Sequence, residues 1–516
     1  MKGVKGMGLY DYGIYQVIKR NAKAHGNGVA LICGNERISY SILLEKVDRL
    51  ACGLAKSGVE RGDRIAVLAL NSLEYLYLYG AAARLGAIVL PINWRLSQQE
   101  IEYVISDCSP KVVFVGAEFR DTMSPLVPRF ESLKKWYSLG QGGGRFSVFS
   151  ELMDNDGFCP DLEVSSDAPY VIIHTAAVNG YPRGATLSQR GLMTCSLQFL
   201  YCWRLTKEDC NLCILPLFHF GGFGTTLSVM HAGGKTILLP RFDADLAVKH
   251  IAEDKVTVMG EFPPILSTLL DKAKVMNLDI KSLRIVVGMD QPETIKRFEE
   301  TTGGSFWVFY GQTETSGLVS LSSYSEKPGS AGISGFISEI EIMDEYGNIL
   351  DVGKTGEIVV RGPMVFKGYW GRDEDNAYTF RDGWHHTGDL GCLDPDGYLW
   401  YKGRKSEKEL IKPGGENVYP AEVEKVILDH PMIQETSVIG VSDKQWGEAI
   451  KAVCVLKQGK GLTENELIDF VAARIARYKK PKYVVFVPSL PKTADGLIDR
   501  EKIKADHCGQ ESYGRE

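Results

Sequence analysis

The sequence contains no long hydrophobic run. No apolar stretch approaches the roughly 18–20 residues needed to cross a bilayer. The first residues, M-K-G-V-K-G-M-G-L-Y-D-Y-G, carry positive charge without the apolar segment that follows it in a signal peptide. Excess positive charge is also lacking, since the net charge is −6 and the pI about 6.0, which argues against a nucleic-acid-binding protein. These absences predict a cytoplasmic protein with no membrane span and no nucleic-acid partner.

The cysteines lack the spacing of a metal site or of a disulfide-rich domain. The eleven cysteines are scattered along the chain, so we expect buried or free thiols in a reducing compartment. His385 and His386 are adjacent, and no cysteine or further histidine frames them, which argues against a metal site there. Internal repeats and low-complexity segments are also missing.

The sequence does contain enough residues for more than one domain. Its length of 516 residues exceeds the roughly 250–300 at which a single core stops growing. In the first 150 residues, helical patterns at 42–56 and 73–85 alternate with short apolar runs at 65–70 and 86–91. The alternation resumes after a loop at 138–150 and continues to Gly288. This rhythm predicts parallel βαβ sheets covered by helices.

The character of the chain changes near residue 335. Short strands separated by turn sequences predict an antiparallel β region up to residue 402. Beyond it, helices at 418–428 and 467–477 alternate with strands in a smaller unit. We therefore expect an α/β fold with a large N-terminal domain of parallel sheets plus an antiparallel β subdomain (1–403), a charged hinge (404–409) and a small C-terminal α+β domain (410–516).

Two motifs place ligand-binding groups next to predicted strands. Y-G-Q-T-E (310–314) follows the apolar run F-W-V-F, at a sheet edge where α/β folds bind ligands. There the Thr313 hydroxyl can donate to a phosphate oxygen, and the Glu314 carboxylate can hold Mg²⁺. In H-T-G-D-L-G (386–391), we expect Asp389 in a turn. Its carboxylate can accept two ribose hydroxyls, or it can simply stabilise the turn.

Two further motifs combine glycines with charged or aromatic residues. In G-R-K-S-E-K-E-L-I-K-P-G-G-E-N (403–417), Arg404 suits a phosphate or ribose, and the tight Gly414–Gly415 turn allows close approach to a slender ligand. In L-P-L-F-H-F-G-G-F-G (215–224), aromatic residues beside glycines favour a cavity wall, the alternative being the end of a core strand.

In this order and spacing, the motifs resemble those of the AMP-forming acyl-CoA synthetases. These belong to the adenylate-forming superfamily, with firefly luciferase and the adenylation domains of peptide synthetases. The resemblance runs from I-S-Y-S-I-L-L-E-K (38–46) to P-K-T-A-D-G (491–496), and its most specific parts are E-I-V-V-R-G-P-M-V-F-K-G-Y-W and F-R-D-G-W-H-H-T-G-D-L-G. It implies that a carboxylic acid reacts with Mg-ATP to an acyl-adenylate, that coenzyme A then displaces AMP, and that the small domain is mobile between the two steps.

The resemblance also implies roles for individual residues. The nucleotide would contact the segment Gly288, Met289 and Asp290, then Tyr310, Gly311, Gln312 and Thr313, with Asp389 and Arg404 holding the ribose. Thr175, Arg183, Thr313, Glu314 and the hinge residue Lys408 would be catalytic, with Glu314 serving Mg²⁺. Gly414 and Gly415 would flank the coenzyme A channel, and His219, Phe220, Gly221, Gly222 and Gly311 would border the acyl pocket.

Two departures from the family pattern fall on the ATP side. The phosphate loop usually reads T-S-G-T-T-G-x-P-K-G, whereas here T-A-A-V-N-G-Y-P-R-G (175–184) has lost the inner hydroxyls and one glycine. A hydrogen bond lost to a charged group costs roughly 1.5–3 kcal/mol. The family's final motif, P-K-T-x-x-G-K, ends here in Leu497, which cannot donate or carry charge; Lys492 or Lys502 would need a shifted loop to replace the lysine.

These observations predict an acyl-CoA synthetase with a slowed adenylation step, able to run toward ATP from acyl-CoA, AMP and pyrophosphate. Two alternatives are an acyl-AMP ligase that loads a carrier protein, and a catalytically weak adenylate-binding protein. Phe218 to Phe223 and E-F-P-P (261–264) favour an aromatic, alicyclic or short-to-medium branched acid. The expected partners are this acid, ATP and coenzyme A, and both monomer and homodimer stay open.

Overall fold

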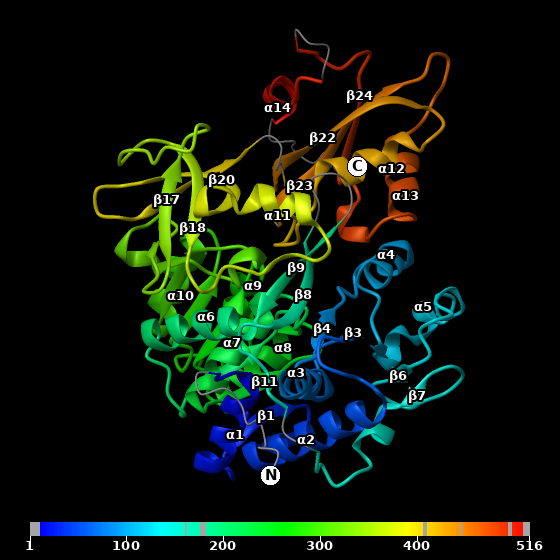
Figure 1. Cartoon of the computed structure of the whole chain (residues 1–516). Coiled ribbons are helices and arrows are strands. Elements are labelled where there is room, and N and C mark those ends of the chain that lie inside the picture. The colour runs from blue at the N-terminus through cyan, green and yellow to red at the C-terminus, as the bar shows by residue number, and fades with distance from the viewer. Residues whose placement is uncertain are drawn as a thin grey trace.

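The computed structural model describes residues 11–159, 162–175, 182–405, 410–443, 446–493 and 498–508. Figure 1 shows a large body built from the first 400 residues and a smaller unit, coloured orange to red, that lies at one end of it. The described chain forms four sheets, of eight, nine, four and three strands.

The eight-stranded sheet confirms the first predicted βαβ units. Its order is β19-β9-β8-β4-β3-β5-β6-β7, in which β6 is Trp136–Ser138 and β7 is Ser147–Val148. From β8 through β7, neighbouring strands are parallel. Apolar residues at helical spacing bury one face of each covering helix against the sheet. The elements that matter below are α2 (Tyr40–Lys56), β3 (Arg64–Leu68), α3 (Leu73–Leu85), β4 (Ile88–Pro91), α4 (Gln98–Cys108), β5 (Val112–Val115), β8 (Pro169–Thr175) and β9 (Arg183–Ser188).

The nine-stranded sheet has the order β16-β15-β14-β13-β12-β10-β11-β1-β2. Its outer strands are β1 (Val29–Cys33) and β2 (Glu36–Ser39) at one edge and β15 (Ser320–Ser323) and β16 (Ile333–Ser334) at the other. Its central strands are parallel and buried, as their continuous apolar sequences predict. The relevant elements are α6 (Gln189–Cys202), β10 (Cys210–Cys213), α7 (Phe220–Ala232), β11 (Lys235–Leu238), α8 (Ala244–Glu253), β12 (Val258–Glu261), α9 (Ile265–Met276), β13 (Ile285–Gly288), α10 (Pro292–Thr302) and β14 (Ser305–Tyr310).

The predicted antiparallel region is the four-stranded sheet β17 (Glu339–Met343), β18 (Gly356–Arg361), β20 (His385–Leu393) and β21 (Leu399–Arg404). Its sequence also contains two elements that the prediction did not include. β19 (Gly368–Tyr369) pairs with β9 of the eight-stranded sheet, and α11 (Asp373–Thr379) follows it. The segment between β18 and β20 therefore connects the β subdomain to strand β9, which follows the predicted phosphate loop.

The small C-terminal unit is a three-stranded sheet covered by helices, as expected. It comprises α12 (Pro420–Leu428), β22 (Ile433–Asp443), β23 (Gly447–Leu456), α13 (Glu464–Ala472), β24 (Tyr483–Phe486) and α14 (Arg500–His507). The helix predicted at 467–477 begins and ends earlier. Beyond its end, the Ala476 N–H donates to Glu100 of the large domain at 3.1 Å, because the chain there turns toward that domain. The domain limits 1–403, 404–409 and 410–516 stay a prediction.

The expectation that all cysteines are free was wrong for one pair. Cys52 on α2 and Cys159 form a disulfide across 107 positions of sequence, a pairing that local spacing cannot reveal. Asn155 holds the same loop on α2 through a hydrogen bond to the Arg49 carbonyl at 3.0 Å. The other nine cysteines are free; among them Cys210 and Cys213, although separated by only two residues, lie buried along β10.

Among the described residues, no helix is both long enough and apolar enough to pass through a bilayer.

Candidate functional site

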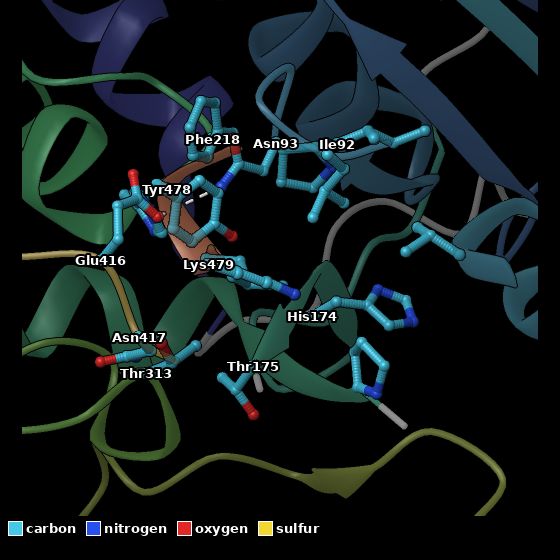
Figure 2. Close-up of a pocket in the computed structure, with 16 residues that line it drawn as sticks. Ile92, Asn93, His174, Thr175, Phe218, Thr313, Glu416, Asn417, Tyr478 and Lys479 are labelled. Atoms are coloured by element: carbon cyan, nitrogen blue, oxygen red, sulfur yellow. Dashed lines mark hydrogen bonds and ion pairs between the residues drawn. The ribbon is translucent and has the colours of Figure 1, made fainter. Parts of the chain in front are cut away.

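A cavity lies between the large and the small domain, at the carboxyl ends of β4 and β8 (Figure 2). Three of the predicted site residues, Thr175, His219 and Thr313, line it. The small domain supplies Glu416, Asn417, Tyr478 and Lys479. The large domain adds Pro91, Ile92, Asn93, Leu96, Val104, Ile173, His174, Pro182 and Phe218.

The predicted metal ligand lies beside the ends of the phosphate loop. Glu314 follows β14 and is buried; its Oε1 accepts hydrogen bonds from the Tyr369 hydroxyl at 2.8 Å and from Thr175 at 3.4 Å. Arg183 lies over the Tyr369 ring at 4.0 Å and pairs with Asp375 at 3.2 Å. The structure therefore brings Thr175, Arg183 and Glu314 together around one tyrosine. A carboxylate and a guanidinium so close to the loop suit Mg²⁺ and phosphate respectively.

The predicted ribose site is a buried hydrogen-bond network around Asp389. This residue lies inside β20, opposite Arg404 of β21, so the prediction of a turn was wrong. Its carboxylate accepts from the Tyr310 hydroxyl at 2.8 Å and from Gln312 Nε2 at 2.6 Å, and pairs with Arg404 Nε at 3.1 Å. Burial, and then the Asp389 charge, raise the pKa of Tyr310, so its hydroxyl stays a neutral donor.

The predicted adenine segment lies at the end of β13. A side chain at Gly288 would run into the Glu261 backbone carbonyl, so only glycine fits there. Met289 is exposed and Asp290 half-buried, and burial raises the pKa of Asp290. The cavity of Figure 2 includes none of these three residues.

The aromatic and glycine-rich motif is more closely packed than the sequence indicated. Phe220 begins α7, and its ring fills the space beside Gly224 and Gly317, where any side chain would collide with it. A Cβ at Gly222 would meet the carbonyl oxygens of residues 215 and 216, and one at Gly311 would meet the backbone of residues 317 and 318. These glycines allow backbone segments to approach each other. Among the five predicted acyl-pocket residues, His219 alone lines the cavity of Figure 2.

The predicted Gly414–Gly415 turn lies against the large domain. Both residues have positive φ, +58° and +85°, where glycine is favoured. A Cβ on Gly415 would lie 3.0 Å from the ring of Phe262, and one on Gly414 would lie 2.9 Å from the ring of Trp446. A side chain on Gly415 would therefore fill the space between the turn and Phe262 of the large domain.

Two charged groups that the sequence reasoning missed also join the domains here. Glu416, directly after Gly415, accepts from Asn93 at 3.3 Å, pairs with Arg95, and lies 3.5 Å from His219. Burial raises the pKa of Glu416, but His219 and Arg95 outweigh it, so the pKa lies below its usual range. The adjacent glycine motif was a usable signal for Glu416.

Lys479 carried no such signal in the sequence. Its Nζ pairs with Glu100 of the large domain at 2.6 Å and with Glu422 of the small domain at 2.7 Å, and its side chain is only 3% exposed. Burial alone lowers the pKa of Lys479, but the surrounding acidic groups outweigh burial and raise it. Because these partners are 379 and 57 residues away, only the fold shows the contact.

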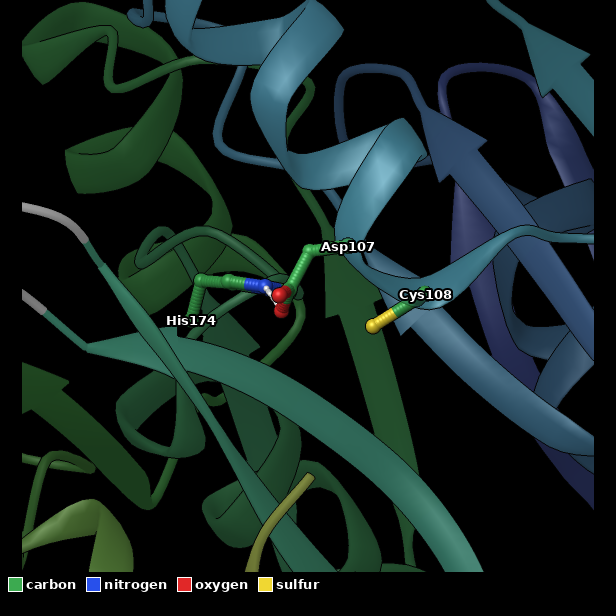
Figure 3. Close-up of side chains that lie close together, drawn as sticks. All are labelled: Asp107, Cys108 and His174. Atoms are coloured by element: carbon green, nitrogen blue, oxygen red, sulfur yellow. Dashed lines mark hydrogen bonds and ion pairs between the residues drawn. The ribbon is translucent and has the colours of Figure 1, made fainter. Parts of the chain in front are cut away.

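A cluster of metal-ligand type side chains lies next to the cavity (Figure 3). The ligand atoms of Asp107, Cys108 and His174 all lie within 4.8 Å of one another. However, the two carboxylate oxygens of Asp107 are already bonded to His174 and to Arg372. Burial raises the pKa of Cys108 to about 12, so the thiol is neutral near pH 7. The chemistry therefore favours a hydrogen-bonded network over a metal site.

Several predicted residues lie outside the described part of the chain. These are Lys408, Leu497 and the middle of the phosphate loop, residues 176–181, including the substituted Ala176, Ala177 and Val178. Lys492, one possible replacement for the missing lysine, pairs instead with Glu435 of the small domain at 2.7 Å. Lys502 lies on α14, which Figure 1 shows on the side of the small domain away from the large body.

Comparisons with known proteins identify the family of the chain. The family model described as "AMP-binding enzyme" matches residues 18–370, and "AMP-binding enzyme C-terminal domain" matches residues 422–497. The indoleacetate–CoA ligase of Aromatoleum aromaticum is 35% identical over 94% of this chain and 96% of its own length. The feruloyl-CoA synthase of an Amycolatopsis species is 33% identical over 94% and 97%.

Among solved structures, a double mutant of o-succinylbenzoate CoA synthetase from Bacillus subtilis, bound to a product analogue, is 29% identical. It superposes with a TM-score of 0.84 over 96% of this chain and 98% of its own. The chain belongs to the AMP-binding enzyme family, the adenylate-forming enzymes that include the acyl-CoA ligases.

Proposed function

We propose that the protein is an AMP-forming acyl-CoA synthetase. The observation that carries the proposal is the convergence of three sets of groups on one interdomain region: the Asp389 network, the Glu314 group beside the loop, and the Gly414–Gly415 turn. The first suits a ribose, the second a phosphate with its metal, and the third a slender thiol carrier. The ligase activity of the relatives supports the same conclusion.

On the ATP side, the protein's own groups bind and orient the nucleotide. The Asp389 carboxylate would accept the ribose hydroxyls while Arg404 and Gln312 fix its orientation. Thr175 and Arg183 would contact phosphate oxygens, and Glu314 would hold Mg²⁺, which neutralises charge on the phosphates. The acid's carboxylate oxygen then attacks the α-phosphorus and pyrophosphate leaves. Gly288, Met289 and Asp290 would border the adenine, with Tyr310 against its ring.

On the thioester side, the small domain closes the site. The coenzyme A thiol would enter past Gly414 and Gly415, attack the acyl carbon of the adenylate, and release AMP. His219 lies at this entrance, 3.5 Å from Glu416, where it can gate the acyl pocket bordered by Phe220, Gly221, Gly222 and Gly311. Lys408 would act at the hinge when the small domain rotates between the two steps.

For the acid, an aromatic carboxylate is favoured. Phe218 and Tyr478 line the cavity together with aliphatic residues, and Phe262 lies against the glycine turn, so aromatic rings are available to pack on an aromatic acid. Two relatives are named for indoleacetate and feruloyl substrates, both aromatic. The reaction takes place in the cytoplasm, within the metabolism of carboxylic or fatty acids.

One alternative has a specific observation behind it. The loop at 175–184 has lost its inner hydroxyls, and Leu497 replaces the final lysine, so a protein that binds adenylates but turns over weakly would also fit. Carrier-protein loading in place of coenzyme A is distinguished by the acceptor that the enzyme requires.

The test is thioester formation with Mg-ATP and coenzyme A across indoleacetate, benzoate, cyclohexanecarboxylate and short and medium straight-chain acids. A reverse assay supplies acyl-CoA, AMP and pyrophosphate and measures ATP. We expect turnover with an aromatic or alicyclic acid, dependent on coenzyme A. Adenylate formation that ignores coenzyme A would indicate the carrier-protein ligase. AMP binding without turnover in either direction would indicate the weak adenylate-binding protein and contradict the synthetase.

A further inference from the structure

A buried polar network around Asp107 holds the beginning of the phosphate loop. Asp107 lies in the last turn of α4, and its carboxylate contacts His174 Nε2 at 3.0 Å and Arg372 Nη2 at 2.6 Å. The side chains of His174 and Asp107 are only 6% and 7% exposed. His174 is the residue directly before Thr175, where the loop begins. Figure 3 shows the imidazole and the carboxylate directed at each other.

The same network reaches the other end of the loop. Tyr103, one turn earlier on α4, donates its hydroxyl to the Pro182 carbonyl at 3.0 Å and accepts from Arg372 at 3.1 Å. Next to it, the Trp370 N–H donates to the Gly184 carbonyl at 2.8 Å. Both ends of the loop are therefore held by α4 and by the segment at 370–372. None of these groups belongs to the nucleotide-binding set of the preceding section.

The orientation of one ring in the network, the His174 imidazole, needs a physical explanation. His174 Nδ1 is buried, and it has no hydrogen-bond partner among the residues that the structure describes. A buried polar atom without a partner is unfavourable, so the ring is held in this orientation by its other contacts. The charge balance agrees, because burial raises the pKa of Asp107 but His174 and Arg372 outweigh it and lower the pKa. Asp107 is thus a carboxylate that fixes the imidazole.

The loop itself explains why such support is needed. Residues 176–178 are Ala-Ala-Val, which offer no side-chain donor to phosphate or to one another. Binding groups must be held near their productive geometry, and a loop with few contacts of its own depends on its neighbours for that.

We propose that Asp107, His174, Arg372 and Tyr103 form a brace that sets the position of the phosphate loop for the ATP half-reaction. The proposal rests on the proposed synthetase function. His174 is a positioning residue: it acts through Thr175, whose hydroxyl lies 3.4 Å from Glu314 Oε1. Its loss therefore affects the step that uses ATP, and leaves the transfer of a preformed acyl group to coenzyme A unaffected.

The experiment measures the two half-reactions separately in the full-length protein. ATP–pyrophosphate exchange reports the first, and thioester formation from a synthetic acyl-adenylate reports the second. We expect His174→Ala to reduce exchange about tenfold or more and to raise the KM for Mg-ATP, with the second half-reaction within twofold. His174→Gln, whose amide can still donate to Asp107, should recover most of the exchange, and Tyr103→Phe should show a smaller loss than His174→Ala.

The matched control is His250→Ala. This histidine also contacts an aspartate, Asp254, at 2.7 Å, but on helix α8, which packs on the nine-stranded sheet and not on the sheet that carries the loop. It should leave both half-reactions unchanged. Equal losses in both half-reactions that follow the melting temperature, or no loss in His174→Ala, would overturn the brace. Stoichiometric zinc that disappears in Cys108→Ala would overturn it in favour of a metal site.

Failure of the proposed function would look different. In that case the unaltered protein shows neither exchange nor thioester formation. The Kd for Mg-ATP then tests the brace, with weaker binding in His174→Ala than in His250→Ala supporting it and equal binding overturning it.

Discussion

The proposed ribose end of the site and the interface between the domains are both built on buried carboxylates, but the partners of these carboxylates come from different places. Asp389 is bonded to Tyr310, Gln312 and Arg404, all in the large domain or at its boundary. Glu416 belongs to the small domain, yet its partners Asn93 and Arg95 belong to the large one.

The difference bears on how the two regions work. A rotation of the small domain would leave the Asp389 network intact. It would break the contacts of Glu416 with Asn93 and Arg95. It would also break the contact of Lys479 with Glu100, but not the one with Glu422 of the same domain. The first region is therefore suited to hold a nucleotide through both half-reactions. The second is suited to stabilise one domain arrangement, the one in which Gly415 lies on Phe262. Substitutions should separate these roles.

The largest effect is expected at the ribose end. Asp389→Ala removes the acceptor of the buried Tyr310 hydroxyl and of two partly buried donors, Gln312 and Arg404, as well as the groups proposed for the ribose hydroxyls. A buried donor left unpaired costs about 1–3 kcal/mol. We expect at least a hundredfold loss in both half-reactions, measured as exchange and as thioester formation. The control is Asp394→Ala in the same β subdomain, where the carboxylate accepts from Trp400 Nε1 at 3.0 Å. That variant should lower the melting temperature and leave the KM for ATP unchanged.

The second-largest expected effect is an increase in the rate of the adenylation step. Leu497→Lys restores a cation to the position that contacts the α-phosphate in the related enzymes, so ATP–pyrophosphate exchange should rise more than tenfold. Transfer from a synthetic acyl-adenylate to coenzyme A should stay within twofold. Lys492→Met is the companion variant, because Lys492 is occupied by Glu435. An unchanged exchange rate in Leu497→Lys, or a collapse of exchange in Lys492→Met, would show that Leu497 does not limit adenylation.

A smaller and one-sided loss is expected at the interface. Lys479→Met leaves Glu100 and Glu422 facing each other without their shared cation, which disfavours the closed arrangement. Thioester formation from the acyl-adenylate should fall about fivefold while exchange changes less than twofold. Lys457→Met serves as the control, since the Lys457 ammonium donates to the Pro431 carbonyl of its own domain at 2.9 Å. Equal losses in both half-reactions would place Lys479 in general stability instead.

The two regions also differ in how far the sequence could predict them. Tyr310, Gln312 and Asp389 stand in short motifs, so the sequence could name them as candidate residues of one site. It could not give their contact, which joins the nine-stranded and the four-stranded sheets, nor the place of Asp389 in a strand. Lys479 could not be found in this way, because its partner Glu100 lies on a helix of the other domain. The Cys52–Cys159 disulfide escaped prediction for the same reason.

The local sequence pattern predicted helices and strands better than it predicted contacts between residues far apart in the sequence. The helix at 73–85 has the predicted limits, because a continuous buried face and the Gly86 C-cap specify it locally. The C-terminal helix predicted to end at residue 477 ends at Ala472, since Ala476 bonds to Glu100 instead of continuing the helix. Tertiary contacts, absent from periodicity, decided that boundary.

The smallest effect concerns a buried carboxyl that has none of the partners of Asp389. Glu261, at the end of β12, is fully buried, and no side chain in the described part of the protein bonds to either carboxyl oxygen. Burial, and then Asp290, raise its pKa well above the usual value. A carboxyl whose pKa is higher in the folded than in the unfolded state contributes stability below about pH 4.3, and that contribution is lost as pH rises toward the folded pKa.

Glu261→Gln removes this ionisation, so the melting temperature at pH 8 should rise by about 2 °C and fall less between pH 5.5 and 8 than in the unaltered protein. The control is Glu253→Gln on α8, where the glutamate is exposed, and it should not change the pH dependence of the melting temperature. If the melting temperature of Glu261→Gln instead follows the same pH profile as that of the unaltered protein, Glu261 is paired in solution, as Asp389 is.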